Sequence, residues 1–243
     1  MKKRIWLGIL VVVTLIFSWG VYQFLLPETQ DLLKTISPPE YMRVDESKPL
    51  KEQTRLVEIG GRRFNVPLMY IDGALDKGIV QDGMNLKYVL PDYRSLWDLK
   101  DRQEYLKEFE AGHTAHMLLL PQSTMPPIEI SANNILNGYS KHEYVGKVNG
   151  LEKYNAHSLN IDKLELYDEF YLEKSKDNKI VGFLDCSPAS RVPKPGCNYH
   201  FIDKNIRYDI RINTKNYFLK WREQKQSAIK FIDSFEIKSE QKN

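Results

Sequence analysis

The longest apolar segment of the chain stands near its N-terminus. Residues 5–26 contain no charged side chain and follow three cations, Lys2, Lys3 and Arg4. A helix of this length spans about 33 Å, close to the roughly 30 Å hydrocarbon core of a bilayer. The pattern predicts one transmembrane helix, and the cations before it favour a cytoplasmic N-terminus and a translocated remainder. The sequence has no second apolar run of comparable length.

The same segment also fits a cleaved signal peptide, which has a similar charged start and small residues before the cut. A cut after Gly20 fits this interpretation, but the apolar run continues to Leu26. Trp6, Trp19 and Tyr22 suit the interfaces of a retained helix. We therefore favour an uncleaved signal-anchor over residues 1–27. This predicts a single-pass protein of a bacterial inner membrane whose C-terminal domain lies in the periplasm.

After the anchor, residues 28–55 read as a tether, because Pro38 and Pro39 disfavour a continuous helix and polar residues follow. The next segment, residues 56–66, predicts a β-hairpin. Two short apolar-polar runs flank Gly60-Gly61, a strong signal for a tight turn.

Alternation of apolar and polar residues predicts further strands. It is clearest where Ile206, Tyr208, Ile210 and Ile212 alternate with polar residues, after a three-residue turn at residues 203–205. The predicted strands cover residues 84–90, 113–120, 163–173, 180–186, 198–202 and 206–212.

Two helices are expected from 3.6-residue periodicity. The first begins at the N-cap Ser95, places Leu96, Leu99, Leu106 and Phe109 on one buried face, and ends at Gly112. The second begins at Asn213 or Thr214 and ends near Phe235. The buried stripe of this second helix contains Phe218, Trp221, Ala228, Ile232 and Phe235. Residues 131–136 are ambiguous between helix and loop. These elements predict an α+β domain over residues 56–243, with a mostly antiparallel sheet and helices packed on it.

Charge and cysteine content narrow the environment of this domain. The net charge of +3 is supplied by the three cations at the N-terminus, and the other 32 basic and 32 acidic residues cancel. A neutral domain argues against non-specific nucleic-acid binding. Cys186 and Cys197 are the only cysteines. In a translocated domain this pair predicts a disulfide, with two buried thiols as the alternative, and it cannot form a cysteine-rich zinc site.

Several of these features together resemble a known group of proteins. They are residues 59–67 (IGGRRFNVP), residues 90–92 (LPD), the pair Cys186 and Cys197, and Leu219 with Trp221 in the last helix. In this pattern the chain resembles membrane-anchored envelope proteins of Gram-negative bacteria. Some of these are similar to the immunity proteins that protect a cell from toxins delivered by type VI secretion systems of neighbouring cells. The resemblance implies a periplasmic binding protein and carries no catalytic residue.

Candidate catalytic and metal-binding residues are few. His113 and His116 are three positions apart, but on a strand such positions face opposite sides, which disfavours a shared metal ion. Acidic residues from Asp98 to Glu110 are interleaved with cations, which is typical of a solvated helix face. A glycosidase-type pair of carboxylates remains an alternative, because it requires only a suitable distance between two carboxyl groups. No cofactor is expected.

Two segments are candidates for binding a partner. The loop at residues 187–196 carries Arg191 and Lys194 between the two cysteines, so a disulfide would hold its ends together. The closing helix carries five cations, which indicate either contact with an anionic surface or simple solubility. We therefore expect a membrane-anchored periplasmic binding protein, and the specific role that the resemblance implies is that of an immunity protein against a type VI toxin. The alternatives are a structural component of an envelope complex and an envelope hydrolase that uses Asp98, His113 or His116.

Overall fold

A computed structural model of the chain describes residues 47–73, 78–139, 141–157, 167–187, 195–213 and 218–237. They belong to one compact unit, Val44–Asn243. The predicted anchor, most of the tether, and Arg191 and Lys194 lie outside the described residues. Among the residues that are described, none forms a helix long and apolar enough to cross a membrane.

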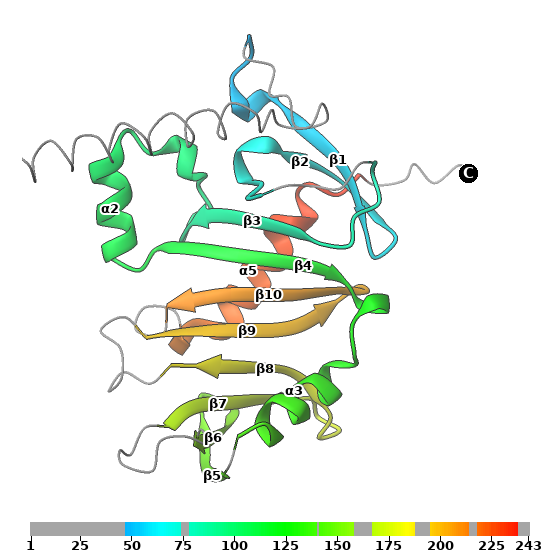
Figure 1. Ribbon diagram of the computed structural model, residues 1–243, viewed down its shortest axis with the longest axis vertical. Helices are drawn as coiled ribbons and strands as arrows, with labels where there is room; N and C mark the ends of the chain where they lie inside the picture. Colours follow the sequence, from blue (N-terminus) through cyan, green and yellow to red (C-terminus); the bar gives the residue numbers. More distant parts are fainter. Residues whose placement is uncertain are drawn as a thin grey trace, which may run out of the picture. The chain divides into compact units, whose positions relative to one another are not determined.

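Eight of the described strands form one antiparallel sheet, which confirms the predicted α+β class (Figure 1). Their order across the sheet is β3-β4-β10-β9-β8-β7-β6-β5, so β10, the last of the described strands, lies between β4 and β9. The strands are β3 (Met84–Val89), β4 (Thr114–Pro121), β5 (Lys141–Val148), β6 (Leu151–His157), β7 (Tyr167–Lys174), β8 (Ile180–Cys186), β9 (Gly196–Asp203) and β10 (Ile206–Asn213).

The predicted hairpin is confirmed as β1 (Thr54–Ile59) and β2 (Arg62–Pro67). Ile59 pairs with Arg62, so Gly60 and Gly61 form a two-residue turn, and both have positive φ (60° and 79°). The end of the chain extends this hairpin. The amide of residue 65 donates to the carbonyl of residue 235, and the amide of residue 237 donates to the carbonyl of residue 63.

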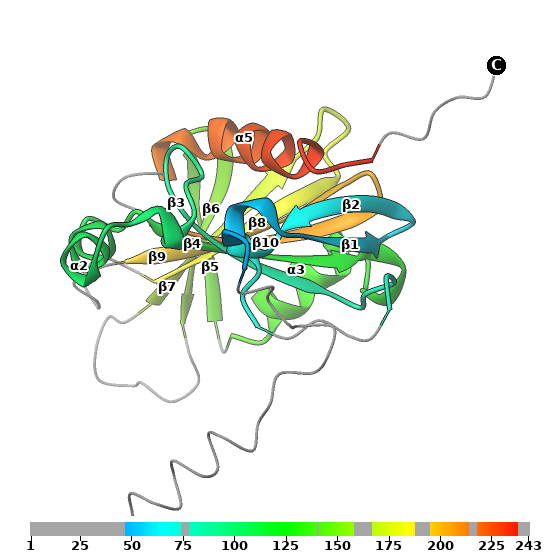
Figure 2. The ribbon, with the colours of Figure 1, turned by 90° about the horizontal axis from the view of Figure 1, so that it is seen from above.

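The sheet is covered on both faces. Helix α5 (Trp221–Asp233), preceded by the short 3₁₀ turn η6 (Phe218–Lys220), lies on one face, and helix α3 (Ile128–Asn137) lies on the other (Figure 2). The predicted stripe of α5 is confirmed, since Trp221, Ala228 and Ile232 are buried. Asn213 is the last residue of β10, and Thr214, the other expected start of this helix, lies outside the described residues.

Strand β10 shows why both faces are filled. Ile206, Tyr208, Ile210 and Ile212 are all buried in the core cluster beneath α5, as their alternation predicts. On the other face Arg207 is also buried, with 4% of its surface exposed. There it donates to Asp209 Oδ1 (3.0 Å) and to the Ser131 hydroxyl of α3 (2.9 Å). A buried cation held by a carboxylate and a helix hydroxyl is consistent with the need to pair charge that is removed from water.

The predicted helix between Ser95 and Gly112 is wrong in its continuity. Ser95 does form a capping box, but only with the 3₁₀ turn η4 (Leu96–Asp98), after which the chain is extended at Leu99. Asp101 then accepts the Glu104 amide proton and starts a separate helix, α2 (Arg102–Glu110). A second N-cap inside the expected helix interrupts it, because the aspartate side chain competes for the backbone amides. None of the residues of α2 is buried, so the expected stripe is also wrong.

Two other local features differ from the sequence analysis. The turn after β9 contains two residues, not three, because Asp203 pairs directly with Ile206 and both Lys204 and Asn205 have positive φ. The hairpin of β5 and β6, joined through residues 149–150 (Asn-Gly), was not predicted. Strand β5 is largely exposed and lacks a clean apolar alternation, although Asn-Gly is itself a strong hairpin signal.

Candidate functional site

The predicted disulfide is present and lies at the end of the sheet where β8 and β9 leave it. Cys186 and Cys197 are direct register partners, and the amide of Ser187 donates to the carbonyl of Gly196 (3.0 Å). The bond therefore holds the two ends of the loop that carries Arg191 and Lys194. These two candidate residues lie outside the described residues, so their role stays a prediction.

The structure separates the two candidate histidines. The His113 ring is hydrogen-bonded through Nδ1 to the Glu108 carboxylate of α2 (Nδ1–Oε2 2.6 Å), whereas His116 lies in β4 and faces Asp72 (3.6 Å). Burial and the nearby cations Lys87 and Arg211 lower the pKa of His116. Among the described residues, no group of three or more histidine, cysteine or acidic side chains is placed to hold a metal ion.

The acidic residues considered for a hydrolase have structural partners. The carboxylate of Asp98 accepts the Ser95 amide proton (3.0 Å), and that of Asp101 caps α2. Glu108 pairs with Arg94 (3.1 Å) as well as His113, and these two partners hold its pKa below the usual range despite some desolvation. Each of these carboxylates thus organises the segment from residue 94 to residue 113.

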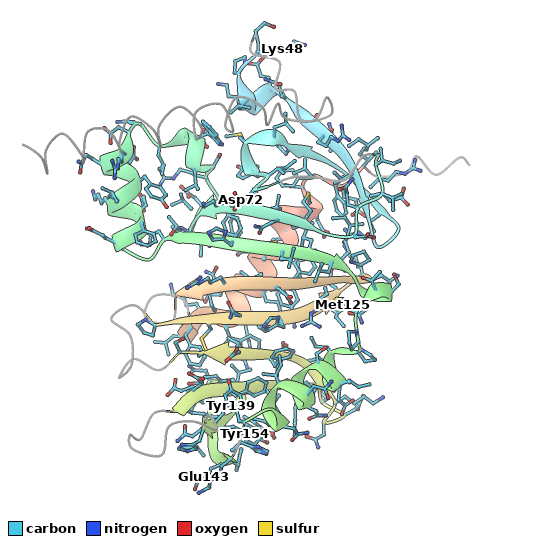
Figure 3. The ribbon with its side chains drawn as sticks, viewed as in Figure 1. Lys48, Asp72, Met125, Tyr139, Glu143 and Tyr154 are labelled. Carbon is cyan, nitrogen blue, oxygen red and sulfur yellow. A yellow bond between two sulfur atoms is a disulfide. The ribbon has the colours of Figure 1, made fainter. Side chains whose placement is uncertain are left out.

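Two other carboxylates, Asp168 of β7 and Asp185 of β8, lie toward the opposite end of the sheet. Figure 3 shows Asp72 beside β3 and Tyr139 near β7 and β8, far from it. The Tyr139 hydroxyl donates to Asp185 Oδ1 (3.4 Å). Burial and the neighbouring Asp168 raise the pKa of Asp185. This was not foreseen from the sequence, because Asp168 and Asp185 are on different strands. Two carboxylates and one phenol, without a described nucleophile beside them, form a polar cluster under the edge of α3.

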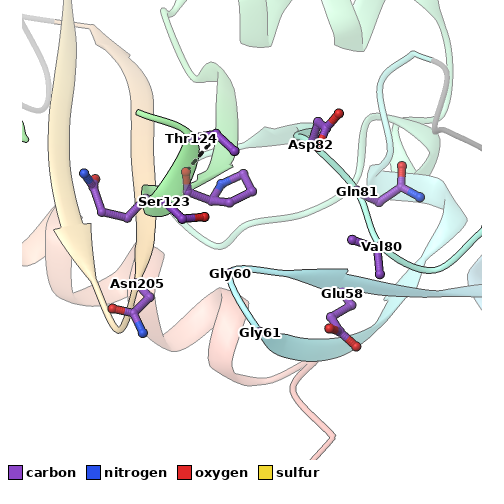
Figure 4. A pocket seen from close by; sticks show the side chains of 11 residues that line it. Glu58, Gly60, Gly61, Val80, Gln81, Asp82, Ser123, Thr124 and Asn205 are labelled. Carbon is purple, nitrogen blue, oxygen red and sulfur yellow. Dashed lines mark hydrogen bonds between the residues drawn. The ribbon is translucent and has the colours of Figure 1, made fainter. Parts of the chain in front are cut away.

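A hollow of about 610 Å³ lies between the β1–β2 turn and the β9–β10 turn (Figure 4). Most of the side chains that line it are polar, and some of them have partners nearby. Glu58 pairs with Arg63 (2.8 Å), and the Thr124 hydroxyl donates to the carbonyl of Pro121 (2.9 Å). The turns approach closely here, since a Cβ added at Gly60 would lie 2.6 Å from the carbonyl oxygen of Asn205. The hollow is an open junction between turns.

Two smaller hollows border helix α2. The first, of about 460 Å³, is lined by Trp97, Tyr105 and Lys87, and the second, of about 300 Å³, by Phe109, His116 and Arg211. Lys87 is the register partner of His116, and His116 is the partner of Arg211, so the three side chains form one row across β3, β4 and β10. We call these six residues the α2 surface. Sequence reasoning missed it, because it treated Leu96 and Phe109 as core positions.

The second hollow also receives the end of the candidate loop. Pro195 and Gly196, the last two residues of the loop, line it together with Phe109. Tyr105 and Phe109, four residues apart on α2, have ring centroids 6.2 Å apart and so connect the two hollows. The α2 surface combines exposed aromatic side chains with cations and is the candidate functional site.

The fold and this site define a class: an α+β protein with an eight-stranded antiparallel sheet whose notable surface is suited to binding. No family model and no curated protein matches the sequence. Among solved structures, the fold is similar to that of Smlt3025, an immunity protein of the Stenotrophomonas maltophilia type IV secretion system. The TM-score is 0.57 at 12% identity, over 81% of this chain and 98% of that one. The iron-regulated outer membrane lipoprotein FrpD of Neisseria meningitidis gives a TM-score of 0.46 at 9% identity, over 77% and 95%. The first likeness establishes a shared fold.

Proposed function

We propose that this chain is a membrane-anchored periplasmic immunity protein, which binds a toxin from a neighbouring cell and so neutralises it. The observation that carries the proposal is the fold, which is similar to that of an immunity protein over 98% of that protein's chain and 81% of this one. The disulfide supports an oxidising compartment, because such bonds persist in the periplasm and are rare in the cytosol. The apolar segment at residues 5–26 supports the anchor.

The chemistry of the described residues supports binding over catalysis. The acids and histidines that suggested a hydrolase serve as helix caps and ion-pair partners. The exposed groups of the α2 surface are aromatic and cationic, and aromatic residues and arginine are enriched at the centres of protein interfaces. An immunity protein acts by occupying its toxin, so such a surface is sufficient for the task.

A protection assay tests this function. Each toxin-like protein encoded beside the gene is directed to the periplasm of a host cell, with or without the full chain. We expect survival only where the chain is produced. A variant without residues 1–27, which stays in the cytoplasm, should not protect against the periplasmic form. If oxidised full-length chain accumulates and no such toxin is neutralised, the proposal is wrong.

The delivery route is tested separately. The sequence resemblance implies a type VI system, whereas the structurally similar Smlt3025 belongs to a type IV system. We propose the type VI route for this chain. Target cells that lack the gene should be killed by an attacker with an intact type VI system and spared by an attacker without it. Killing that depends on a type IV system instead would assign the other route.

A further inference from the structure

Helix α5 buries one side against the sheet and exposes the other (Figure 2). Trp221, Ala228 and Ile232 form the buried side. The exposed side carries mostly polar residues and begins in η6, just before the helix. We call these residues the outer face of α5: Leu219, Lys220, Arg222, Glu223, Gln226 and Lys230. The sequence alone left open whether the cations of this helix contact an anionic surface or only keep it soluble.

The outer face of α5 carries an excess of positive charge. Lys220, Arg222 and Lys230 are exposed and form no ion pair within the described ranges. The Arg222 guanidinium stacks on the ring of Trp221 (4.4 Å), which holds it at the surface of the helix. Glu223 is the one acid among the residues of this face, so three cations and one acid leave a net charge of +2.

The acids that border this face are already paired. Asp233, at the end of α5, accepts from Arg62 (2.6 Å) and Lys204 (2.9 Å), and Glu236 accepts from the same arginine (2.7 Å). The remaining cation of the helix is also compensated, since Lys225 pairs with Glu173 (2.8 Å). These pairs sum to zero, so they do not cancel the excess on the outer face.

Leu219 adds an apolar side chain to the outer face of α5. It is 71% exposed, because Phe218 before it and Trp221 two residues after it occupy the buried positions. The Trp221 indole also donates to the carbonyl of Asn149 (3.2 Å), which fixes this turn to the hairpin of β5 and β6. An exposed leucine beside cations is typical of elements that lie at a membrane interface, where the apolar side chain enters the headgroup boundary and the cations meet lipid phosphates.

The chain enters the domain close to α5. The amide of Leu68 donates to the carbonyl of Gln53 (2.9 Å), which ties the first described turn, η2 (Leu50–Glu52), to η3 (Leu68–Tyr70). Tyr70 of η3 then packs on Phe231 of α5, with ring centroids 5.1 Å apart. Residues 27–46, between the apolar segment and the first described residue, span at most roughly 70 Å when extended. An anchored chain therefore keeps α5 within reach of the bilayer.

The face of the sheet opposite α5 carries the cationic row of the α2 surface. Arg211 lies between Ile210 and Ile212 in β10, and both isoleucines are buried in the core beneath α5. Because neighbouring side chains of a strand point to opposite faces, Arg211 and its register partner His116 lie on the side away from α5. Whatever α5 contacts thus leaves this row uncovered.

We propose that the outer face of α5 rests on the anionic headgroups of the membrane that holds the anchor. Leu219 lies in the headgroup boundary, the three cations meet lipid phosphates, and the row that contains Arg211 is directed away from the bilayer. Anionic lipid attracts clustered lysine and arginine side chains near a membrane. The anchor selects this occupant over an acidic protein, because tethering holds the bilayer at a high effective concentration beside α5. The inference rests on the anchor of the proposed function.

The test places the full chain in lipid nanodiscs and measures contact at single positions. A photo-cross-linking amino acid is introduced either at Gln226, in the outer face of α5, or at Asn134, an exposed position of α3 on the opposite face. In discs of phosphatidylcholine with one third phosphatidylglycerol, lipid should be cross-linked from position 226 and not from position 134. Cross-linking should fall in pure phosphatidylcholine and as salt is added, because ions screen exposed charges.

Charge reversal supplies the matched comparison. Each cation near an anionic surface contributes about fivefold, so the variant Lys220→Glu/Arg222→Glu/Lys230→Glu should shift the docked-to-undocked ratio by about 100-fold toward the undocked state. Leu219→Ala should shift it by a smaller factor. The control variant changes net charge equally at three exposed lysines on other elements and should keep most of the cross-linking: Lys100→Glu/Lys107→Glu/Lys141→Glu.

The outcomes separate this inference from the proposed function. Cross-linking from position 226 that requires phosphatidylglycerol and is lost only in the α5 variant supports the docked face. A chain that is retained in the discs but cross-links equally from both positions, independently of the lipid, or with equal loss in the control variant overturns the docking and leaves the anchor intact. A chain that is not retained in the discs rejects the anchor itself, and the docking with it.

Discussion

Arg62 joins the first hairpin of the domain to the end of its last helix. From the start of β2 its guanidinium donates to Glu236 Oε1 and Oε2 (both 2.7 Å) and to Asp233 Oδ1 (2.6 Å). Its side chain is only 10% exposed, and it lies over the ring of Phe64 (5.1 Å). Replacing Arg62 by Met keeps most of the apolar stem and removes every one of these donors.

The expected cost follows from what each carboxylate retains. Asp233 keeps the ammonium of Lys204 at 2.9 Å, so its loss is partial, whereas Glu236 loses both of its bonds to the guanidinium. Hydrogen bonds to charged groups contribute about 1.5–3 kcal/mol each, and the partial exposure of both acids allows water to replace some of this. We expect Arg62→Met to lower the free energy of unfolding by about 2 kcal/mol. With a slope of about 2 kcal/mol/M, the urea midpoint falls by about 1 M.

The effect should depend on pH in a definite direction. Hydrogen bonding to Arg62 lowers the pKa of Glu236. Burial alone would raise the pKa of Asp233, but the bonds from Arg62 and Lys204 outweigh it and the net shift is downward. A lowered pKa contributes stability that is present above the unfolded value, about 4, and is lost as the pH falls through the folded value. The difference between wild type and Arg62→Met should therefore be full at pH 7 and shrink below about pH 4.

Urea titrations followed by circular dichroism at pH 7 and at several values down to pH 3 measure both effects. Arg63→Met is the matched control, because the neighbouring arginine is 60% exposed and, within the described part of the chain, forms an ion pair with Glu58 alone. Exposed pairs contribute about 0–1 kcal/mol, so this variant should differ little from wild type. The reasoning is refuted if the two variants cost the same, or if the Arg62→Met deficit is undiminished at low pH.

Three further outcomes are expected from thermal unfolding. Arg207→Met should cost about 3 kcal/mol, because it breaks a buried charge pair, while Arg211→Met on the same face should be nearly neutral. Gly182→Ala should cost about 2 kcal/mol by overpacking, since the added Cβ would lie 2.6 Å from Glu173 Oε2. Gly196→Ala, whose nearest contact is an ordinary 3.4 Å, should be mild. Reduction of the disulfide should cost about 3 kcal/mol, from the 11-residue separation that it closes.

The elements that depend on local signals could be predicted from the sequence. Gly60-Gly61 and the alternation from Ile206 to Ile212 specify their turn and strand by backbone geometry and one-sided burial, and both are confirmed. The interruption at Asp101 could have been found, because an aspartate three residues before a glutamate is itself a helix start signal. Here apolar spacing was given more weight than capping, and the capping side chain determined the structure.

The α2 surface could not be derived in the same way. Its row of Lys87, His116 and Arg211 exists only because β4 pairs with β3 on one side and with β10, about 90 residues later, on the other. Strand order depends on long-range packing, which residue patterns do not specify. Phe109 gave a misleading signal for the same reason: its spacing placed it on a buried helix face, but it is 48% exposed in the structure.

The pairing of the last described residues with the first hairpin has a consequence for synthesis. The segment from β1 to β4 leaves the ribosome early, yet β4 lacks its partner β10 and β2 lacks residues 235–237 until the chain is almost complete. The early half is then an unfinished assembly with open edges, of the kind that aggregates or attracts chaperones. A stop codon near residue 230 would accordingly affect the opposite end of the chain, because β2 would be synthesised without residues 235–237, with which it pairs. For the same reason a reporter fused after residue 237 reports on completion of the whole domain.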